Sequence, residues 1–155
     1  MAKIGLYFGS FNPVHIGHMA IAGYMTEFAG LDQLWFVVSP HNPLKKKETL
    51  LADHHRLYMS QLAIGDSQKL KTTDIEFKLP VPSYTIDTLT YLKERYPKNE
   101  FSLVWVKTIC LHFINGKMQL NLLAGTRFIF IRDLIQKDSH HFFSIRYYKE
   151  LIFIR

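Results

Sequence analysis

The sequence predicts an α/β protein built on an open, mostly parallel sheet. Short apolar segments alternate with stretches in which apolar residues have helical spacing, in the order strand–helix three times and then a strand. One of these segments is apolar on both faces, which is typical of parallel strands covered by helices on both sides. Glycine and proline separate the segments. This order favours right-handed crossovers in a single domain, for which 155 residues are sufficient.

The first unit comprises a strand, a turn and a helix. Lys3–Phe8 is short and apolar, which predicts a buried strand. Gly9–His15 contains glycine, asparagine and proline and is expected to be a turn. Apolar residues return with helical spacing over Met19–Phe28, and Gly30 is expected to end this helix.

The second and third units follow the same pattern. Leu34–Val38 is the strand that is apolar on both faces, and Pro40–Glu48 is a polar loop with three lysines. Asp53 is expected to cap a helix that runs to about Ile64, and Lys69–Thr73 is expected to form a short strand. The large aromatic side chains assigned to the core in this region are Trp35, Phe36 and Tyr58.

The last predicted helix and strand lie beyond Pro80 and Pro82, which interrupt the chain. Thr85–Tyr96 has the pattern of a helix and is closed by Pro97. Phe101–Val104 begins one more strand, which completes the alternation of strands and helices.

Composition excludes several classes of protein. Hydrophobic residues make up 48% and charged residues 21%, as in folded domains and not in disordered chains. The single cysteine, Cys110, excludes an internal disulfide and a multi-cysteine metal site, and it fits a reducing compartment. No apolar run is long enough to cross a bilayer and the N-terminus lacks a signal-peptide pattern, so we expect no membrane partner.

Charge divides the chain into two parts. The net charge of +6 would by itself favour a polyanionic partner such as nucleic acid. Residues 1–104, however, hold 11 Lys+Arg against 10 Asp+Glu, whereas residues 105–155 hold 8 against 3. The second part also lacks proline, and 14 of its 51 residues are Ile or Phe. We therefore interpret residues 1–104 and 105–155 separately.

The turn after the first strand is the best candidate for chemistry. Ligands of such sheets bind beyond the carboxyl ends of the strands, and this turn reads Gly-Ser-Phe-Asn-Pro-Val-His-Ile-Gly-His over Gly9–His18. Gly9 permits close approach of the backbone to a ligand. If the helix begins near Gly17, its free N–H groups form an anion site, to which His15 and His18 could donate hydrogen bonds. The alternative is an ordinary helix start with two histidines; no third ligand at a recognisable spacing supports zinc.

The same ten residues resemble the signature of the nucleotidylyltransferase superfamily, G-[ST]-F-[DN]-P-x-H-x-G-H. Three further segments resemble bacterial nicotinate-nucleotide adenylyltransferases: Ser39–Lys46, Asp53–Met59 and Pro82–Leu89. The resemblance covers about residues 2–104, which would form the nucleotidylyltransferase (ATP-binding) part of the chain. It implies a Rossmann-like, doubly wound, mostly parallel sheet, the nucleotidylyl transferase fold.

The resemblance implies an enzyme of NAD biosynthesis in the cytoplasm. It would transfer the adenylyl group of ATP to nicotinate mononucleotide, releasing nicotinate adenine dinucleotide and pyrophosphate. Mg²⁺ would be carried mainly by the ATP phosphates, so we expect no metal site made by protein side chains alone. Related adenylyltransferases that use nicotinamide mononucleotide or phosphopantetheine stay open as alternatives, as does a non-catalytic nucleotide-binding remnant.

The resemblance also assigns residues to roles. His15 and His18 would be the catalytic residues that hold the ATP phosphates, and Lys46 would neutralise the triphosphate. Tyr84 and Thr85 would lie where the pyridine nucleotide binds. The full set expected to contact ATP is Gly9, Ser10, Phe11, His15, His18 and Lys46. The partners are therefore the two nucleotides and not nucleic acid, and a homo-oligomer is left open.

Residues 105–155 do not resemble the family, and we interpret them as an out-of-frame tail. Trp105 is encoded by TGG and Val106 by a codon that begins GT, so a one-base shift reads glycine at the junction. The codons that follow then permit the family's Asp-Asn-Leu, His-x-Trp-Lys and Tyr-Pro-Arg-Pro segments in order. Without the family's next strand, the sheet edge near Phe101–Val104 is expected to be unpaired, and the activity of this chain is expected to be impaired.

Overall fold

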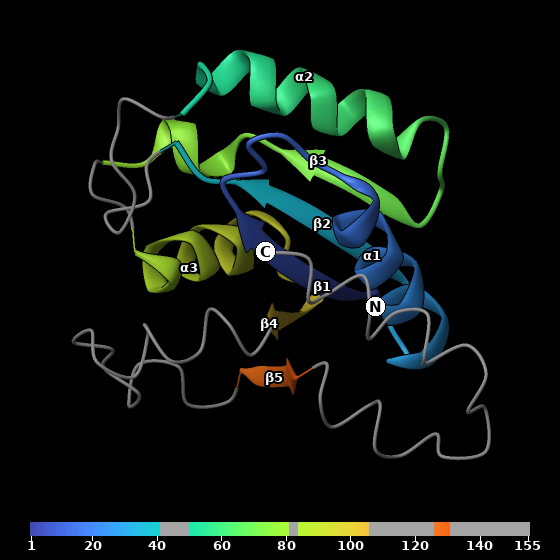
Figure 1. The fold of residues 1–155 in the computed structure, drawn as a ribbon. Helices are drawn as coiled ribbons and strands as arrows, with labels where there is room; N and C mark the ends of the chain where they lie inside the picture. Colours follow the sequence, from blue (N-terminus) through green and yellow to red (C-terminus); the bar gives the residue numbers. More distant parts are fainter. Residues whose placement is uncertain (41–49, 81–83, 106–125, 131–155) are drawn as a thin grey trace.

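In the described part of the chain, five parallel strands form one sheet in the order β3-β2-β1-β4-β5 (Figure 1). The computed structural model describes residues 1–40, 50–80, 84–105 and 126–130. The strands are β1 (Lys3–Gly9), β2 (Gln33–Val38), β3 (Leu70–Thr73), β4 (Glu100–Trp105) and β5 (Arg127–Phe130). The helices are α1 (Ile16–Phe28), α2 (Asp53–Ile64), the 3-10 helix η2 (Ile75–Lys78) and α3 (Thr85–Arg95).

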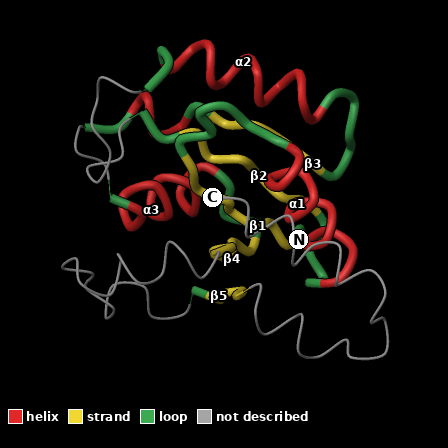
Figure 2. Tube along the Cα trace, in the orientation of Figure 1, coloured by secondary structure: helices red, strands yellow, loops and turns green. Residues whose placement is uncertain are grey.

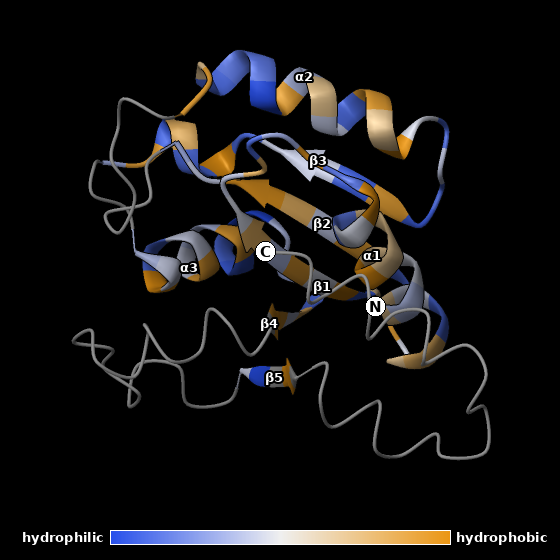
Figure 3. Ribbon diagram, viewed as in Figure 1, coloured by the Kyte–Doolittle hydropathy of each residue, from blue (hydrophilic) through white to orange (hydrophobic). Residues whose placement is uncertain are grey.

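The two faces of the sheet carry separate hydrophobic clusters because neighbouring residues of a strand point to opposite faces. On one face, strand side chains of β1, β2 and β4 pack with α1; this cluster includes Tyr7, Phe36, Val104, Ala22 and Met25. On the other face, alternate residues of the same strands pack with α3; this cluster includes Leu6, Val37, Leu103, Leu89 and Leu92. Figure 3 shows β1 and β2 as the most continuously hydrophobic elements, as expected for strands covered on both sides.

The predicted fold class is confirmed. Strands and helices alternate from β1 to β4 (Figure 2). All the paired strands are parallel. α1 begins three residues earlier than the apolar pattern suggested, at Ile16, and it ends at Phe28 before Gly30, which has a φ of +67°. Only glycine adopts that conformation at no steric cost, so Gly30 ends the helix as expected.

The strand order reverses direction at β1, and this reversal marks the edge of the sheet at which a ligand is expected. From β1 the chain moves outward through β2 to β3, then returns through α3 to β4 on the other side of β1. In open α/β sheets, ligands bind beyond the carboxyl ends of the strands at such a switch point. Figure 1 shows the carboxyl ends of β1 and β2 and the starts of α2 and α3 at the same edge of the sheet.

Three local expectations are wrong. Asp53 does not cap α2: Ala52 precedes the helix without a side-chain cap, and the Asp53 carboxylate accepts a hydrogen bond from Arg56 instead. Tyr58 is not in the core, because it lies on the outer side of α2 with 59% of its surface exposed. The edge of β4 is not unpaired, because β5 pairs with Ser102–Trp105. β5 lies beyond the predicted boundary at residue 104, and its Ile129 joins the cluster that contains Val104.

No helix in the described part of the chain is long and apolar enough to span a membrane.

Candidate active site

The turn after β1 is held in place by both of its neighbours. The Ser39 N–H donates to the Gly9 carbonyl at 2.9 Å, which continues the pairing of β1 and β2 beyond the strands. The Asn12 side-chain oxygen accepts a hydrogen bond of 2.9 Å from the Leu51 N–H, just before α2. These two hydrogen bonds tie the turn to the segment after β2 and to the residues before α2.

The side chain of Phe11 anchors the turn in the hydrophobic cluster that contains Tyr7 and Phe36. Its side chain is 2% exposed and its ring lies 5.5 Å from that of Tyr7 and 5.1 Å from that of Phe36. A Cβ atom added to Gly9 would lie 2.9 Å from the Phe11 ring, so only glycine fits above it. Phe11 has a φ of +43°, a region that non-glycine residues rarely occupy. Such strain is held by the surrounding packing and is frequent at functional sites.

His15 and His18 form a reciprocal cap at the start of α1. The Gly17 N–H donates to Nδ1 of His15 at 3.2 Å, and the His15 N–H donates to Nδ1 of His18 at 3.2 Å. The two imidazole rings lie against each other, with centroids 3.8 Å apart. His18 also contacts the ring of Phe11, with centroids 5.1 Å apart. The turn and the helix start are therefore one packed unit.

These hydrogen bonds determine which ring nitrogens carry protons. A neutral imidazole has one acceptor and one donor nitrogen, and both Nδ1 atoms are acceptors here. The proton of each neutral ring therefore lies on Nε2, which makes Nε2 a hydrogen-bond donor. Two such donors stand at the N-terminus of a 13-residue helix, whose backbone N–H groups and dipole favour an anion.

Arg56 joins the turn after β1 to the segment after β2. Its side chain is fully buried, although it lies on the helix α2. The guanidinium donates to the backbone carbonyls of Ser10, Ser39 and Pro40, and also to the Leu51 carbonyl and the Asp53 carboxylate. The distances are 2.8 Å to Ser39, 3.2 Å to Pro40, 3.0 Å to Leu51 and 2.6 Å to Asp53.

A buried carboxyl group lies beside the second of these segments. Glu76 in η2 is 5% exposed and accepts a hydrogen bond of 3.1 Å from the hydroxyl of Thr88, which lies in the first turns of α3. The Ser39 side chain forms a second hydrogen bond with this carboxyl group. Burial raises the pKa of Glu76 above its usual value, and the two hydrogen bonds oppose this shift.

The start of α3 carries the residues expected to bind the second substrate. Tyr84 precedes the helix and is 63% exposed, and Thr85 is its first residue and is half-buried. The Tyr84 N–H donates to the Asp87 carboxylate at 3.2 Å, so Asp87 satisfies the helix start. Lys46 and the rest of residues 41–49 lie outside the described residues, as do residues 81–83.

The two histidines lie at a helix start, as the sequence predicted, whereas the buried Arg56 and Glu76 were not predicted. Both are charged side chains in segments that read as helix surface or loop, and no local pattern shows that they are buried. The one available signal was the resemblance of Asp53–Met59 to the family, which contains Arg56 without assigning it a role.

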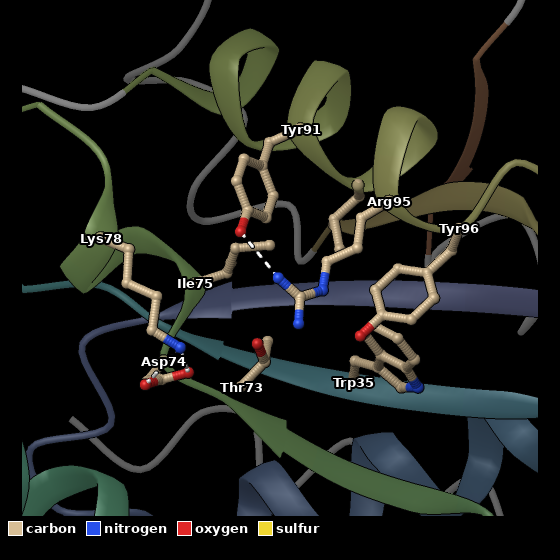
Figure 4. Close-up of a pocket in the computed structure, with 9 residues that line it drawn as sticks. Trp35, Thr73, Asp74, Ile75, Lys78, Tyr91, Arg95 and Tyr96 are labelled. Atoms are coloured by element: carbon tan, nitrogen blue, oxygen red, sulfur yellow. Dashed lines mark hydrogen bonds and ion pairs between the residues drawn. The ribbon is translucent and has the colours of Figure 1, made fainter.

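A shallow hollow lies elsewhere, on the α3 side of the sheet. Trp35, Tyr91, Tyr96, Arg95, Lys78 and Asp74 line it (Figure 4). The Tyr91 hydroxyl and the Arg95 guanidinium are 3.0 Å apart there. Trp35 belongs to the cluster under α3, whereas His18 contacts the opposite cluster through Phe11, so the hollow is separate from the histidine pair. None of the predicted site residues lines it.

Among the described residues, no group of three or more His, Cys, Asp or Glu side chains could hold a metal ion. Two carboxylates lie in the hydrogen-bond network at this edge of the sheet. Glu76 accepts a hydrogen bond from the Thr88 hydroxyl, and Asp53 accepts one from Arg56. The described side chains therefore offer no preformed metal site at this edge of the sheet.

Sequence comparison finds curated relatives of this chain. A curated protein of Flavobacterium johnsoniae, named "Probable nicotinate-nucleotide adenylyltransferase", is 65% identical over 102 residues, 66% of this chain and 53% of that protein. A protein of the same name from Cytophaga hutchinsonii is 47% identical over 121 residues, 78% of this chain and 63% of that protein. The chain thus spans about half to two-thirds of the length of these curated relatives.

Solved structures show the same fold. The nicotinic acid mononucleotide adenylyltransferase of Plasmodium falciparum, complexed with NaAD, superposes with a TM-score of 0.66 at 20% identity over 84% of this chain and 75% of that one. A second structure of that protein, complexed with APC, has a TM-score of 0.60 at 19% identity over 84% of this chain and 74% of that one. The model of the cytidylyltransferase-like family matches residues 6–141, and this chain belongs to that family.

Proposed function

We propose that this chain transfers the adenylyl group of ATP to nicotinate mononucleotide, giving nicotinate adenine dinucleotide and pyrophosphate, a step of NAD biosynthesis in the cytoplasm. The observation that carries the proposal is the His15–His18 pair, whose Nε2 donors stand at the N-terminus of α1 and at the switch point of the sheet. The names of the curated relatives support the choice of substrates.

In the proposed reaction an oxygen of the mononucleotide phosphate attacks the α-phosphorus of ATP. The bond from that phosphorus to the bridging oxygen of the β-phosphate breaks, and pyrophosphate leaves with the electron pair. No protein nucleophile is needed, so the protein contributes alignment and charge stabilisation. His15 and His18 donate from Nε2 to phosphate oxygens, and the N–H groups at the start of α1 add to this field. Mg²⁺, when present, neutralises the ATP phosphates as their counter-ion.

The remaining sites complete the proposal. The backbone of Gly9, Ser10 and Phe11 would contact the nucleotide, and Lys46 would approach the triphosphate from the segment after β2. Tyr84 and Thr85 would bind the pyridine nucleotide, because α3 begins at the same edge of the sheet (Figure 1). The exposed Tyr84 ring is available for stacking on a flat heterocycle.

The test is release of pyrophosphate from ATP by the purified chain with nicotinate mononucleotide. The matched control is the double variant His15→Ala, His18→Ala, which lacks both donors and leaves every strand residue unchanged. Parallel reactions with nicotinamide mononucleotide and with phosphopantetheine identify the acceptor. Turnover with nicotinate mononucleotide above the control supports the proposal, whereas a rate equal to that of the control with every acceptor refutes catalysis by this chain.

We also propose that residues 105–155 are an out-of-frame continuation of the coding sequence. The lack of proline, the Ile and Phe content and the excess of basic residues in this part support the proposal. The strand β5 is compatible with an out-of-frame origin, because Arg127–Phe130 is rich in residues with high strand propensity. The coding DNA across Val104 and Trp105 should be read from an independent clone; the same base sequence in every source would refute the frameshift.

A further inference from the structure

Arg56 is a charged group in a place where charge is costly. Its side chain has no exposed surface, and an unpaired buried charge destabilises a protein strongly. A guanidinium has five N–H donors in one plane, one on Nε and two on each terminal nitrogen. Arg56 uses Nε once, Nη1 twice and Nη2 twice, so five acceptors match five donors.

The acceptors belong to the three segments that meet at the carboxyl edge of the sheet. The Ser10 carbonyl belongs to the turn after β1, and those of Ser39 and Pro40 belong to the segment after β2. Leu51 and Asp53 belong to the start of α2, on which Arg56 itself lies. One planar group therefore fixes the position of the β1 turn relative to the β2 segment.

The hydrogen bonds also fix the direction of the peptide units. In a planar trans peptide the C=O and the following N–H point in opposite directions. Because the Ser10 carbonyl points toward Arg56, the N–H of Phe11 is directed away from the guanidinium. The orientation of the backbone that the proposed function places against ATP is thus set by a residue from another element.

We propose that Arg56 is a positioning residue for nucleotide binding: it sets the turn after β1 and the segment after β2 in the arrangement that the phosphates of ATP require, without touching the nucleotide. This inference rests on the proposed function for the identity of the ligand. The geometric part, that Arg56 orders the two segments, stands on the hydrogen bonds alone.

The substitution Arg56→Lys tests the inference with little change in charge. An ammonium group has three donors at one point, so it cannot satisfy five acceptors that lie around a plane. We expect the dissociation constant for ATP, measured by calorimetry and corrected for any unfolded fraction, to rise about tenfold or more. Arg95→Ala, which removes an exposed arginine on α3, is the matched control and should leave that constant unchanged.

Chemical rescue separates positioning from general loss of structure. In Arg56→Ala, guanidinium ion added far below denaturing concentrations should enter the vacated space and restore ATP affinity, whereas ammonium ion and urea should not. If Arg56→Ala does not fold, the Arg56→Lys measurement decides alone. Corrected ATP affinity of Arg56→Lys within twofold of the wild type would overturn the proposal.

Amide hydrogen exchange tests the geometric part even if the chain binds no ATP. Arg56→Lys should accelerate exchange in peptides that cover Gly9–His15 and leave Glu100–Trp105 in β4 unchanged. Unchanged exchange in Gly9–His15 would overturn the positioning role. Failure of wild-type ATP binding with accelerated exchange in the variant would instead refute the proposed function and leave Arg56 as the residue that orders this edge.

Discussion

The substitution His15→Asn separates the two tasks that the structure gives to one imidazole. Nδ1 of His15 accepts the Gly17 N–H at 3.2 Å and caps α1, whereas Nε2 is the donor proposed for a phosphate oxygen. The Asn amide oxygen occupies about the position of Nδ1, and Asn is among the best N-cap residues. His15→Asn therefore keeps the cap and removes the donor, while His15→Ala removes both.

The structure gives a magnitude for each task. Loss of an N-cap costs about 1 kcal/mol of stability, and substitution of one good cap by another costs a few tenths at most. A hydrogen bond to a charged group contributes roughly 1.5–3 kcal/mol, which corresponds to a change of roughly 10- to 150-fold in a dissociation constant. His15 is exposed, so neither variant leaves a cavity in the core.

Two measurements check the separation. Urea unfolding should give His15→Asn a free energy of unfolding close to that of the wild type and should give His15→Ala a value about 1 kcal/mol lower. Calorimetric titration with a non-hydrolysable ATP analogue should show the same loss of affinity in both variants. Wild-type affinity in a folded His15→Asn protein would refute the role of the Nε2 donor, and equal stability of His15→Ala would refute the cap.

Three further predictions concern the core and the buried carboxyl group. Leu103→Ala removes a fully buried side chain from β4 and should lower the free energy of unfolding by about 2–5 kcal/mol in urea titrations. Gly5→Ala places a Cβ atom 2.5 Å from Cδ1 of Leu31 in a buried strand and should cost about 1–3 kcal/mol in the same assay; an unchanged value would show that Leu31 moves freely. The pKa of Glu76 is raised in the folded state, so the folded state holds the proton more tightly and the wild type loses stability as pH rises above the unfolded pKa. The stability of Glu76→Gln relative to the wild type should therefore increase between about pH 4 and pH 7 in paired unfolding curves, and a flat difference would contradict the buried carboxylate.

The interior strands could be predicted from sequence because both faces are buried. Five of the six residues of β2 are buried, and a short apolar run of this kind is typical of a parallel strand that is covered on both faces. The start of α1 was predictable for a related reason. Gly17 and the two histidines mark a helix N-terminus locally, and the hydrogen bonds that confirm it span no more than three residues.

The features that were missed depend on partners far away in the chain. β5 was not expected as part of the sheet, because the high strand propensity of Arg127–Phe130 does not by itself identify a partner strand; pairing with β4 places these residues in the sheet. Tyr58 was assigned to the core on its aromatic character, but α2 packs through Leu57 and turns the next residue outward. Tertiary packing overrides residue type in both cases.

Arg56 shows why residue type alone misleads at this edge of the sheet. Arginine is usually exposed, and a buried ion pair is often no more stable than a well-packed apolar replacement. Here most of its acceptors are backbone carbonyls, which no substitution can remove, so an apolar residue would leave the partly buried carbonyls of Ser10, Ser39 and Pro40 without this donor. A charged residue at this position follows from the irregular backbone around it. In the proposed function this turn directs N–H groups toward the phosphates of ATP, which leaves its carbonyls to find donors within the protein.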